Sequence, residues 1–149
     1  MNVLIVYASS HHQNTQKLVD AICERYPVKA VKVTGTHDMD LESYDVIGLA
    51  SGIAFGKFYP TMERFAQEQL PHGKKVFFLY TCGRNNRKYT ESITHLVEER
   101  GGEILGAYGC LGFDTYGPFK LIGGIAKGHP TEEEQKGAAD FFARTVGAC

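Results

Sequence analysis

A polar loop with several hydroxyl groups follows an apolar run at the start of the chain. The run, residues 3–8, is rich in β-branched residues and predicts a strand buried on both faces. Apolar residues then recur at helical spacing, so we expect a helix to begin near Thr15. The N–H groups and the positive dipole end of this helix favour an anion, and the hydroxyls of Ser9, Ser10 and Thr15 would help to hold a phosphate. An ordinary Ser/Asn-rich turn with a helix cap is the alternative.

The same loop excludes several well-defined phosphate sites. It contains neither Lys nor Arg, and it lacks both the Gly-Lys-Ser/Thr of nucleotide P-loops and the G-x-G-x-x-G of dinucleotide-binding domains. Cys82 followed by Arg87 is one residue short of the Cys–Arg spacing of phosphatases. Cys82 therefore remains open to two interpretations, a redox nucleophile or a small loop residue beside a cofactor.

Strands and helices alternate along the chain, which predicts a parallel sheet covered by helices on both faces. Interleaved apolar and charged residues at 28–33 indicate an edge strand with one face in water. Pro60 is a favourable first helical residue, and Thr131 is a predicted N-cap followed by acidic residues. The remaining apolar runs predict strands at 45–50, 74–80 and 103–111.

Four loops follow these strands and should meet at one edge of the sheet. In a parallel sheet, ligands bind at the carboxyl ends of the strands. Two of the loops carry aromatic residues that could stack on a planar ring. Phe55 and Tyr89 could touch such a ligand or pack in the core, whereas Phe58 and Phe65 are expected in the core. The four loops are residues 9–15, 51–59, 81–89 and 112–130.

Composition limits the class of protein. A chain of 149 residues predicts one domain, residues 1–149, and a net charge of −1 argues against nucleic-acid or membrane-surface partners. Without an apolar run of about 18 residues we expect no membrane insertion, and a first strand at Val3 leaves no room for a signal peptide. Four cysteines without C-x-x-C spacing indicate free thiols and a cytoplasmic protein. The histidines are not spaced as metal ligands, so we expect no metal site.

The chain resembles the flavodoxin family over essentially its whole length. The residues 5–9 with Asn14-Thr15 are close to that family's first strand and phosphate loop, and 50–52 and 81–83 match its two ring loops. The resemblance implies an α/β, three-layer flavodoxin-like fold with strand order 2-1-3-4-5, noncovalent FMN, and electron transfer between redox partner proteins, a reductase and an acceptor. The predicted cofactor-binding residues are Ser9, Ser10, His11, His12, Gln13, Asn14, Thr15, Ser51, Gly52, Ile53, Ala54, Phe55, Gly56, Thr81, Cys82, Gly83 and Tyr89.

The chain departs from the family pattern in three places. Gln13 stands where the family has Gly, in a phosphate loop one residue longer. The ring loops are basic, with Lys57, Arg84, Arg87 and Lys88, where electron-carrying flavodoxins are acidic. The long Gly-rich segment 112–130 could be a cover over the cofactor, a pad on the sheet edge or a dimer contact.

Two further functions stay open beside the electron carrier. Residues 51–63 and 116–122 are also similar to menaquinone-dependent protoporphyrinogen dehydrogenases. That similarity favours an FMN-dependent reductase or dehydrogenase acting on a quinone-like or other small acceptor. The third possibility is a binding module that uses the phosphate loop without a flavin.

Overall fold

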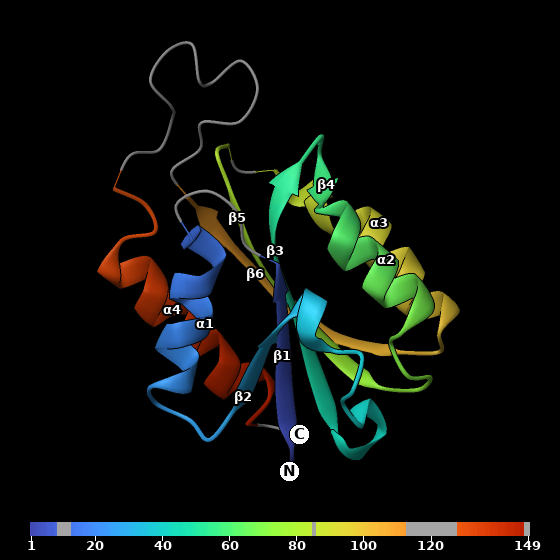
Figure 1. The fold of residues 1–149 in the computed structure, drawn as a ribbon. Helices are drawn as coiled ribbons and strands as arrows, with labels where there is room; N and C mark the ends of the chain where they lie inside the picture. The colour runs from blue at the N-terminus through green and yellow to red at the C-terminus, as the bar shows by residue number, and fades with distance from the viewer. Residues whose placement is uncertain (9–12, 85, 113–127, 148–149) are drawn as a thin grey trace.

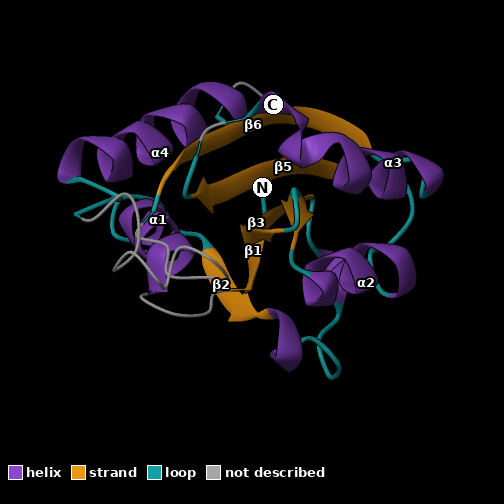
Figure 2. Cartoon of the chain, turned by 90° about the horizontal axis from the view of Figure 1, so that it is seen from above, coloured by secondary structure: helices purple, strands orange, loops and turns teal. Residues whose placement is uncertain are grey.

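The computed structural model describes residues 1–8, 13–84, 86–112 and 128–147, and shows a sheet between two pairs of helices (Figures 1 and 2). Five strands are parallel, in the order β2-β1-β3-β5-β6. A two-residue strand, β4, pairs antiparallel with β3. The strands are β1 Val3–Ala8, β2 Lys29–Lys32, β3 Val46–Ala54, β4 Lys57–Phe58, β5 Lys75–Cys82 and β6 Glu103–Leu111.

Each face of the sheet is covered by two helices. The helices α1 and α4 pack on one face around Leu18, Phe77 and Phe142, and α2 and α3 pack on the other around Phe58, Phe65 and Phe78. The prediction of an α/β fold with helices on both faces is therefore confirmed, and so are Phe58 and Phe65 as core residues. The helices are α1 Asn14–Cys23, α2 Pro60–Glu68, α3 Glu91–Glu99 and α4 Glu132–Thr145, with short 3-10 turns η2 Val33–Gly35, η3 Leu41–Ser43 and η4 Arg87–Thr90.

The predicted sheet order 2-1-3-4-5 is confirmed once the added strand β4 is set aside, because β5 and β6 are the fourth and fifth parallel strands. One detail of the edge strand was wrong. Ala30 and Val31 of β2 are both half-buried and pack against the clusters on opposite faces of the sheet. The expected water-facing side is instead partly covered, because the side chains of Val31 and Val33 continue the core on the α2 side.

The strands β3 and β5 are longer than predicted. The sequence pattern ended the third strand at Ala50, but β3 continues to Ala54 because Ile53 and Ala54 pair with Phe58 and Lys57. Residues 51–59 thus form largely a β-hairpin and its turn, where a loop was expected.

None of the described helices is both long enough and apolar enough to cross a membrane.

The start of α4 is held by a capping box. Thr131 Oγ1 accepts from the Glu134 N–H at 3.1 Å, and Glu134 Oε1 accepts from the Thr131 N–H at 2.8 Å. His129 Nδ1 lies 2.5 Å from the same carboxylate oxygen. Although burial alone would raise it, the hydrogen bonds from the Thr131 backbone and His129 leave the pKa of Glu134 below its ordinary value of 4.5.

We predict that Glu134→Gln destabilises the protein at neutral pH by about 1 kcal/mol, the usual contribution of a helix cap. Because the pKa of Glu134 is lower in the folded than in the unfolded chain, the ionised carboxylate stabilises the fold above the ordinary pKa. That contribution is lost as the pH falls through the lowered value. Urea unfolding should therefore show a difference between wild type and variant at neutral pH that shrinks well below pH 4.5.

The matched control is Glu133→Gln, which removes the same charge from the same helical turn at an exposed position. Its effect should be smaller at neutral pH. Equal destabilisation by both substitutions would assign the effect to the helix dipole and contradict a specific role for the capping carboxylate.

Candidate functional site

The carboxyl ends of β1, β3, β5 and β6 lie at one edge of the sheet, which is at the top in Figure 1. Their parallel direction forces this arrangement, so segments far apart in the sequence meet there. Of the predicted phosphate loop, Ser9, Ser10, His11 and His12 lie outside the described residues. Most of 112–130 also does, and its interpretation as a cover stays a prediction.

The first turn of α1 carries no acidic side chain, and its N-cap residue, Gln13, makes no side-chain capping bond. Gln13 has a left-handed conformation, with φ of 52°. The start of α4 differs, because its first turn contains three glutamates and a complete capping box. The positive end of the α1 dipole is thus not complemented by an acid of its own helix, which is the arrangement that favours a bound anion.

A buried pair of hydroxyl groups joins the start of α1 to the end of β5. Thr15 Oγ1 and Thr81 Oγ1 are 2.9 Å apart, and the two residues are 1% and 4% exposed. Either hydroxyl could be the donor. The pair fixes the predicted phosphate-binding Thr15 relative to Thr81, a predicted ring-loop residue, and so links the two parts of the site.

Asn14 and Gly112 provide a second link at this edge. The Asn14 side chain lies over Gly112, where even a Cβ atom would come within 2.8 Å of the amide nitrogen. The Gly112 N–H in turn donates to the Cys82 carbonyl at 2.9 Å. The first helical turn, the end of β5 and the residue after β6 are therefore in mutual contact.

Ser51 anchors the hairpin that contains the first ring loop. Its hydroxyl donates to the Gly52 carbonyl at 2.7 Å and accepts from the Tyr59 N–H at 3.0 Å. The side chain is fully buried. Tyr59 then places its hydroxyl over Gly52, within 2.3 Å of where a Cβ would stand. These contacts hold the predicted residues Ser51 to Ala54 at the end of β3, where it pairs with β5 and then with β4.

Phe55 and Gly56 form the tip of this hairpin. Ala54 pairs with Lys57, so the turn has two residues, and both have positive φ, 54° and 80°. Asn-Gly suits such turns because Asn tolerates the left-handed region, whereas a bulky aromatic residue is strained there. The Phe55 side chain is 86% exposed. The alternative of a core position for Phe55 is therefore wrong.

The second predicted ring loop follows β5. The Tyr89 hydroxyl donates to the Arg84 carbonyl at 2.8 Å, and its ring packs edge-on against Tyr80 at 6.2 Å. Tyr89 is half-buried and supports this loop from the core side. Gly83, between Cys82 and Arg84, is half-exposed.

The thiols at this edge are buried. Cys82 is 4% exposed and its Sγ donates to the Cys110 carbonyl at 3.4 Å, so its side chain points into the α2–α3 face. Burial raises the pKa of the Cys110 thiol, which keeps it protonated. Cys23, Cys82 and Cys110 form no disulfide bond, and no three His, Cys, Asp or Glu side chains among the described residues are placed to bind a metal.

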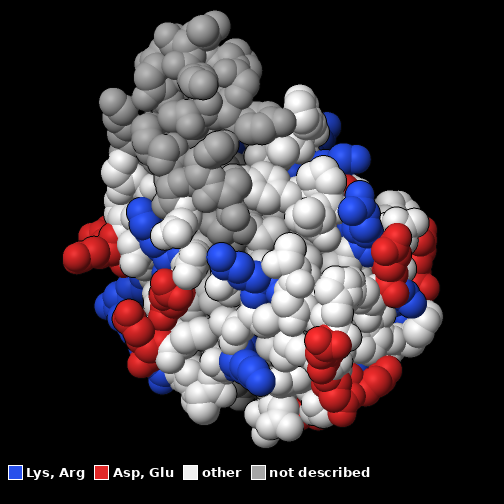
Figure 3. Space-filling view, in the orientation of Figure 1, with Lys and Arg blue, Asp and Glu red and all other residues white. Residues whose placement is uncertain are grey.

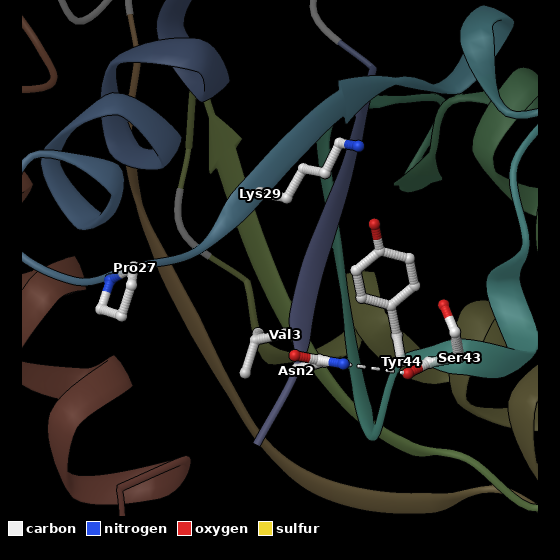
Figure 4. A pocket seen from close by; sticks show the side chains of 6 residues that line it. All are labelled: Asn2, Val3, Pro27, Lys29, Ser43 and Tyr44. Carbon is white, nitrogen blue, oxygen red and sulfur yellow. Dashed lines mark hydrogen bonds between the residues drawn. The ribbon is translucent and has the colours of Figure 1, made fainter.

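A separate hollow of about 290 Å³ lies at the opposite edge of the sheet (Figure 4). It is lined in part by Asn2, Lys29 and Tyr44. Two of its polar groups already have partners, since the Asn2 backbone N–H donates to Asp45 Oδ2 at 2.7 Å and the Asn2 amide to the Ser43 carbonyl at 3.4 Å. This hollow lies where the start of β1 contacts the turn before β3, at the edge of the sheet opposite the predicted site.

The Thr15–Thr81 pair was beyond the reach of sequence reasoning. Both residues were predicted at the site, each for its own loop, but the pattern gave no sign that their hydroxyls meet across 66 positions. The support of Gly52 by Tyr59 was likewise not predicted. The aromatic character of residues 55–59 was the signal, and it was interpreted there as stacking on a ligand.

We predict that Thr15→Val and Thr81→Val each destabilise the protein by about 1–3 kcal/mol, because each leaves one buried hydroxyl without its partner. The double variant should lose clearly less than the sum, since neither hydroxyl then remains. Urea unfolding of the three variants measures this. Strict additivity would mean that the two hydroxyls do not stabilise each other.

We also predict that Phe55→Asn raises the free energy of unfolding by about 1 kcal/mol, because Asn relieves the left-handed strain at the turn. Phe55→Ala is the matched control, since it removes the ring but has no polar side chain that could hydrogen-bond locally, so the left-handed strain remains. Thermal and urea unfolding should show stabilisation by Asn and not by Ala. A destabilised Asn variant would indicate that the ring contributes to folding.

Comparison with known proteins places this chain in a family. Residues 4–112, well over half of the chain, match the family described as flavodoxin domain. An uncharacterized protein of Methanocaldococcus jannaschii is 36% identical over 143 residues, which is 95% of each chain. A flavodoxin from the domain Archaea shares the fold with a TM-score of 0.72, 18% identity and coverage of 99% of this chain and 98% of that one.

A flavoprotein from Lactobacillus acidophilus NCFM, solved in complex with FMN, has a TM-score of 0.59 and 16% identity, covering 73% of this chain and 92% of its own. At these identities, the two solved structures show that the fold is shared. The family match carries the assignment: the chain belongs to the flavodoxin domain family.

Proposed function

We propose that this protein is an FMN-binding electron carrier that passes electrons between redox partner proteins, a reductase and an acceptor. Membership of the flavodoxin domain family supports FMN as the cofactor. FMN, when bound, accepts and returns electrons through its ring. The observation that carries the proposal is that three features lie at one edge of the sheet. They are the N-terminus of α1, which has no acidic residue in its first turn, the Thr15–Thr81 hydroxyl pair, and the β3–β4 hairpin.

The residues present fit such a cofactor. The α1 N-terminus with Asn14 and Thr15, together with Ser9 and Ser10, would hold the phosphate through N–H and hydroxyl donors. The backbone of 51–56 and 81–83 would flank the ring, because the Ser51 and Cys82 side chains are engaged within the protein. The role of these side chains is therefore to set the shape of the ring loops.

The alternative, an FMN-dependent reductase or dehydrogenase of a quinone-like acceptor, predicts a different kinetic behaviour. The number of electrons that a carrier exchanges with its protein partners is proportional to the concentration of the carrier. An enzyme turns over a small acceptor steadily. Measuring reduction of a soluble quinone under a constant supply of reductant separates the two.

We predict that the purified protein binds one FMN and that Thr15→Val weakens FMN much more than riboflavin. The lost hydroxyl would serve the phosphate, and a hydrogen bond to a charged group contributes about 1.5–3 kcal/mol, roughly ten- to hundred-fold in affinity. Fluorescence titration of the flavin-free protein with each flavin measures both affinities.

The control variant is Thr81→Val, which breaks the same hydroxyl pair but keeps the Thr15 hydroxyl proposed to bind the phosphate. It should weaken FMN and riboflavin by similar factors. If Thr15→Val also affects both flavins equally, Thr15 does not bind the phosphate. A protein that binds neither flavin would refute the proposed function itself.

A further inference from the structure

The tip of the β3–β4 hairpin exposes a large aromatic side chain, that of Phe55. Phe55 is 86% exposed and sits at a left-handed position where Asn or Gly would be relaxed. Met1 is the other exposed large hydrophobic residue in the described part of the chain, and it lies at the opposite edge. A strained backbone that presents an apolar side chain to solvent indicates a function outside folding.

Basic side chains lie on the segments next to this hairpin tip, on β4 and near η4. Lys57 follows it by two positions and is 54% exposed, with its Nζ 3.6 Å from Glu63, a carboxylate that is itself only 13% exposed. The strand β4 packs against η4, which carries the exposed Lys88, and the exposed Arg84 precedes η4. Figure 3 shows Lys and Arg side chains beside the hairpin, at the upper right.

The two segments that contain the predicted ring loops carry charges of one sign only. Residues 51–59 and 81–90 together contain four basic residues and no acidic one. The exposed Glu91 begins α3 just beyond this stretch. A positive rim around one exposed aromatic anchor is complementary to a partner with a ring of carboxylates around an apolar recess.

We propose that the hairpin tip with Phe55 and Lys57, together with Arg84 and Lys88, is the docking surface for an acidic electron-transfer protein. The inference rests on the proposed function in that the partner is a redox protein. Transient redox interfaces are small, so one central aromatic residue and a charged rim are enough to define one. A bilayer is less suited to this surface, because stable anchoring takes more apolar area than one aromatic side chain provides.

The test uses the FMN-loaded full chain and a reduced acidic [2Fe–2S] ferredoxin as the probe. In the measured step the ferredoxin is oxidised by one electron and the oxidised FMN is reduced by one. Stopped-flow absorbance gives the second-order rate constant at several salt concentrations. It should fall as salt rises, because opposite charges steer the encounter.

Two lysine pairs with the same change in net charge provide the comparison. Lys57→Gln with Lys88→Gln should lower the rate about five- to tenfold at low salt and flatten its salt dependence. The control pair, Lys29→Gln with Lys75→Gln, removes two exposed charges at the opposite edge of the sheet. It should change the rate by no more than about twofold.

Phe55 is tested separately by calorimetric titration with the oxidised ferredoxin, in which no electron moves. Phe55→Asn and Phe55→Ala should both weaken the complex about tenfold, the scale of a central aromatic anchor. A loss in the stabilised Asn variant could not be attributed to misfolding. Because Phe55 is also a predicted cofactor-binding residue, both variants are first titrated with FMN, whose affinity should stay unchanged. Weaker FMN binding would assign Phe55 to the cofactor and overturn its role as a docking anchor. No electron moves in the ferredoxin titration, so it also distinguishes a failed docking surface from a failed electron carrier.

Several results would overturn the proposal. Equal effects of the two lysine pairs would assign the charge effect to the whole molecule. Tighter binding of a basic c-type cytochrome would reverse the sign of the partner. Phe55-dependent co-sedimentation with phosphatidylserine vesicles, without binding of the ferredoxin, would assign the surface to a membrane instead.

Discussion

Parallel strands cannot be joined by tight turns, so each connection in this sheet must cross one of its faces. Helices therefore cover both sides of β1, β3 and β5, and the strand residues between them are almost completely buried. The same parallel direction brings the carboxyl ends of all strands that precede a candidate loop to one edge of the sheet. The position of the site is thus a consequence of strand direction, and the side chains at the edge only decide what it can bind.

The two helices on the α1–α4 face use their N-terminal ends differently. At the start of α4 the partial positive charge is met by glutamates and by the capping box of Thr131 and Glu134. At the start of α1 no acid is present in the first turn, and a buried hydroxyl contact to Thr81 fixes the helix in place. One end is therefore satisfied within the fold, whereas the other suits an external anion.

The β3–β4 hairpin combines rigid support with local strain. Ser51 holds its base through two hydrogen bonds, and Tyr59 packs over Gly52. At its tip Phe55 adopts a conformation that few bulky residues tolerate, with its ring in solvent. A base held by these contacts lets the fold keep such a tip, and the basic residues Lys57, Arg84 and Lys88 lie in the same region.

Much of this protein was determined by its sequence. Apolar runs at 3–8 and 103–111 gave strands with the same bounds, and Pro60 and Thr131 marked helix starts because their backbone and side-chain chemistry act within one turn. Tertiary structure alone decided the extension of β3 through pairing with β4, the covering of β2 on both faces, and the meeting of Thr15 with Thr81. Periodicity and capping report on neighbours along the chain, whereas these contacts exist only after the sheet has assembled, because they join residues through space and carry no local signature.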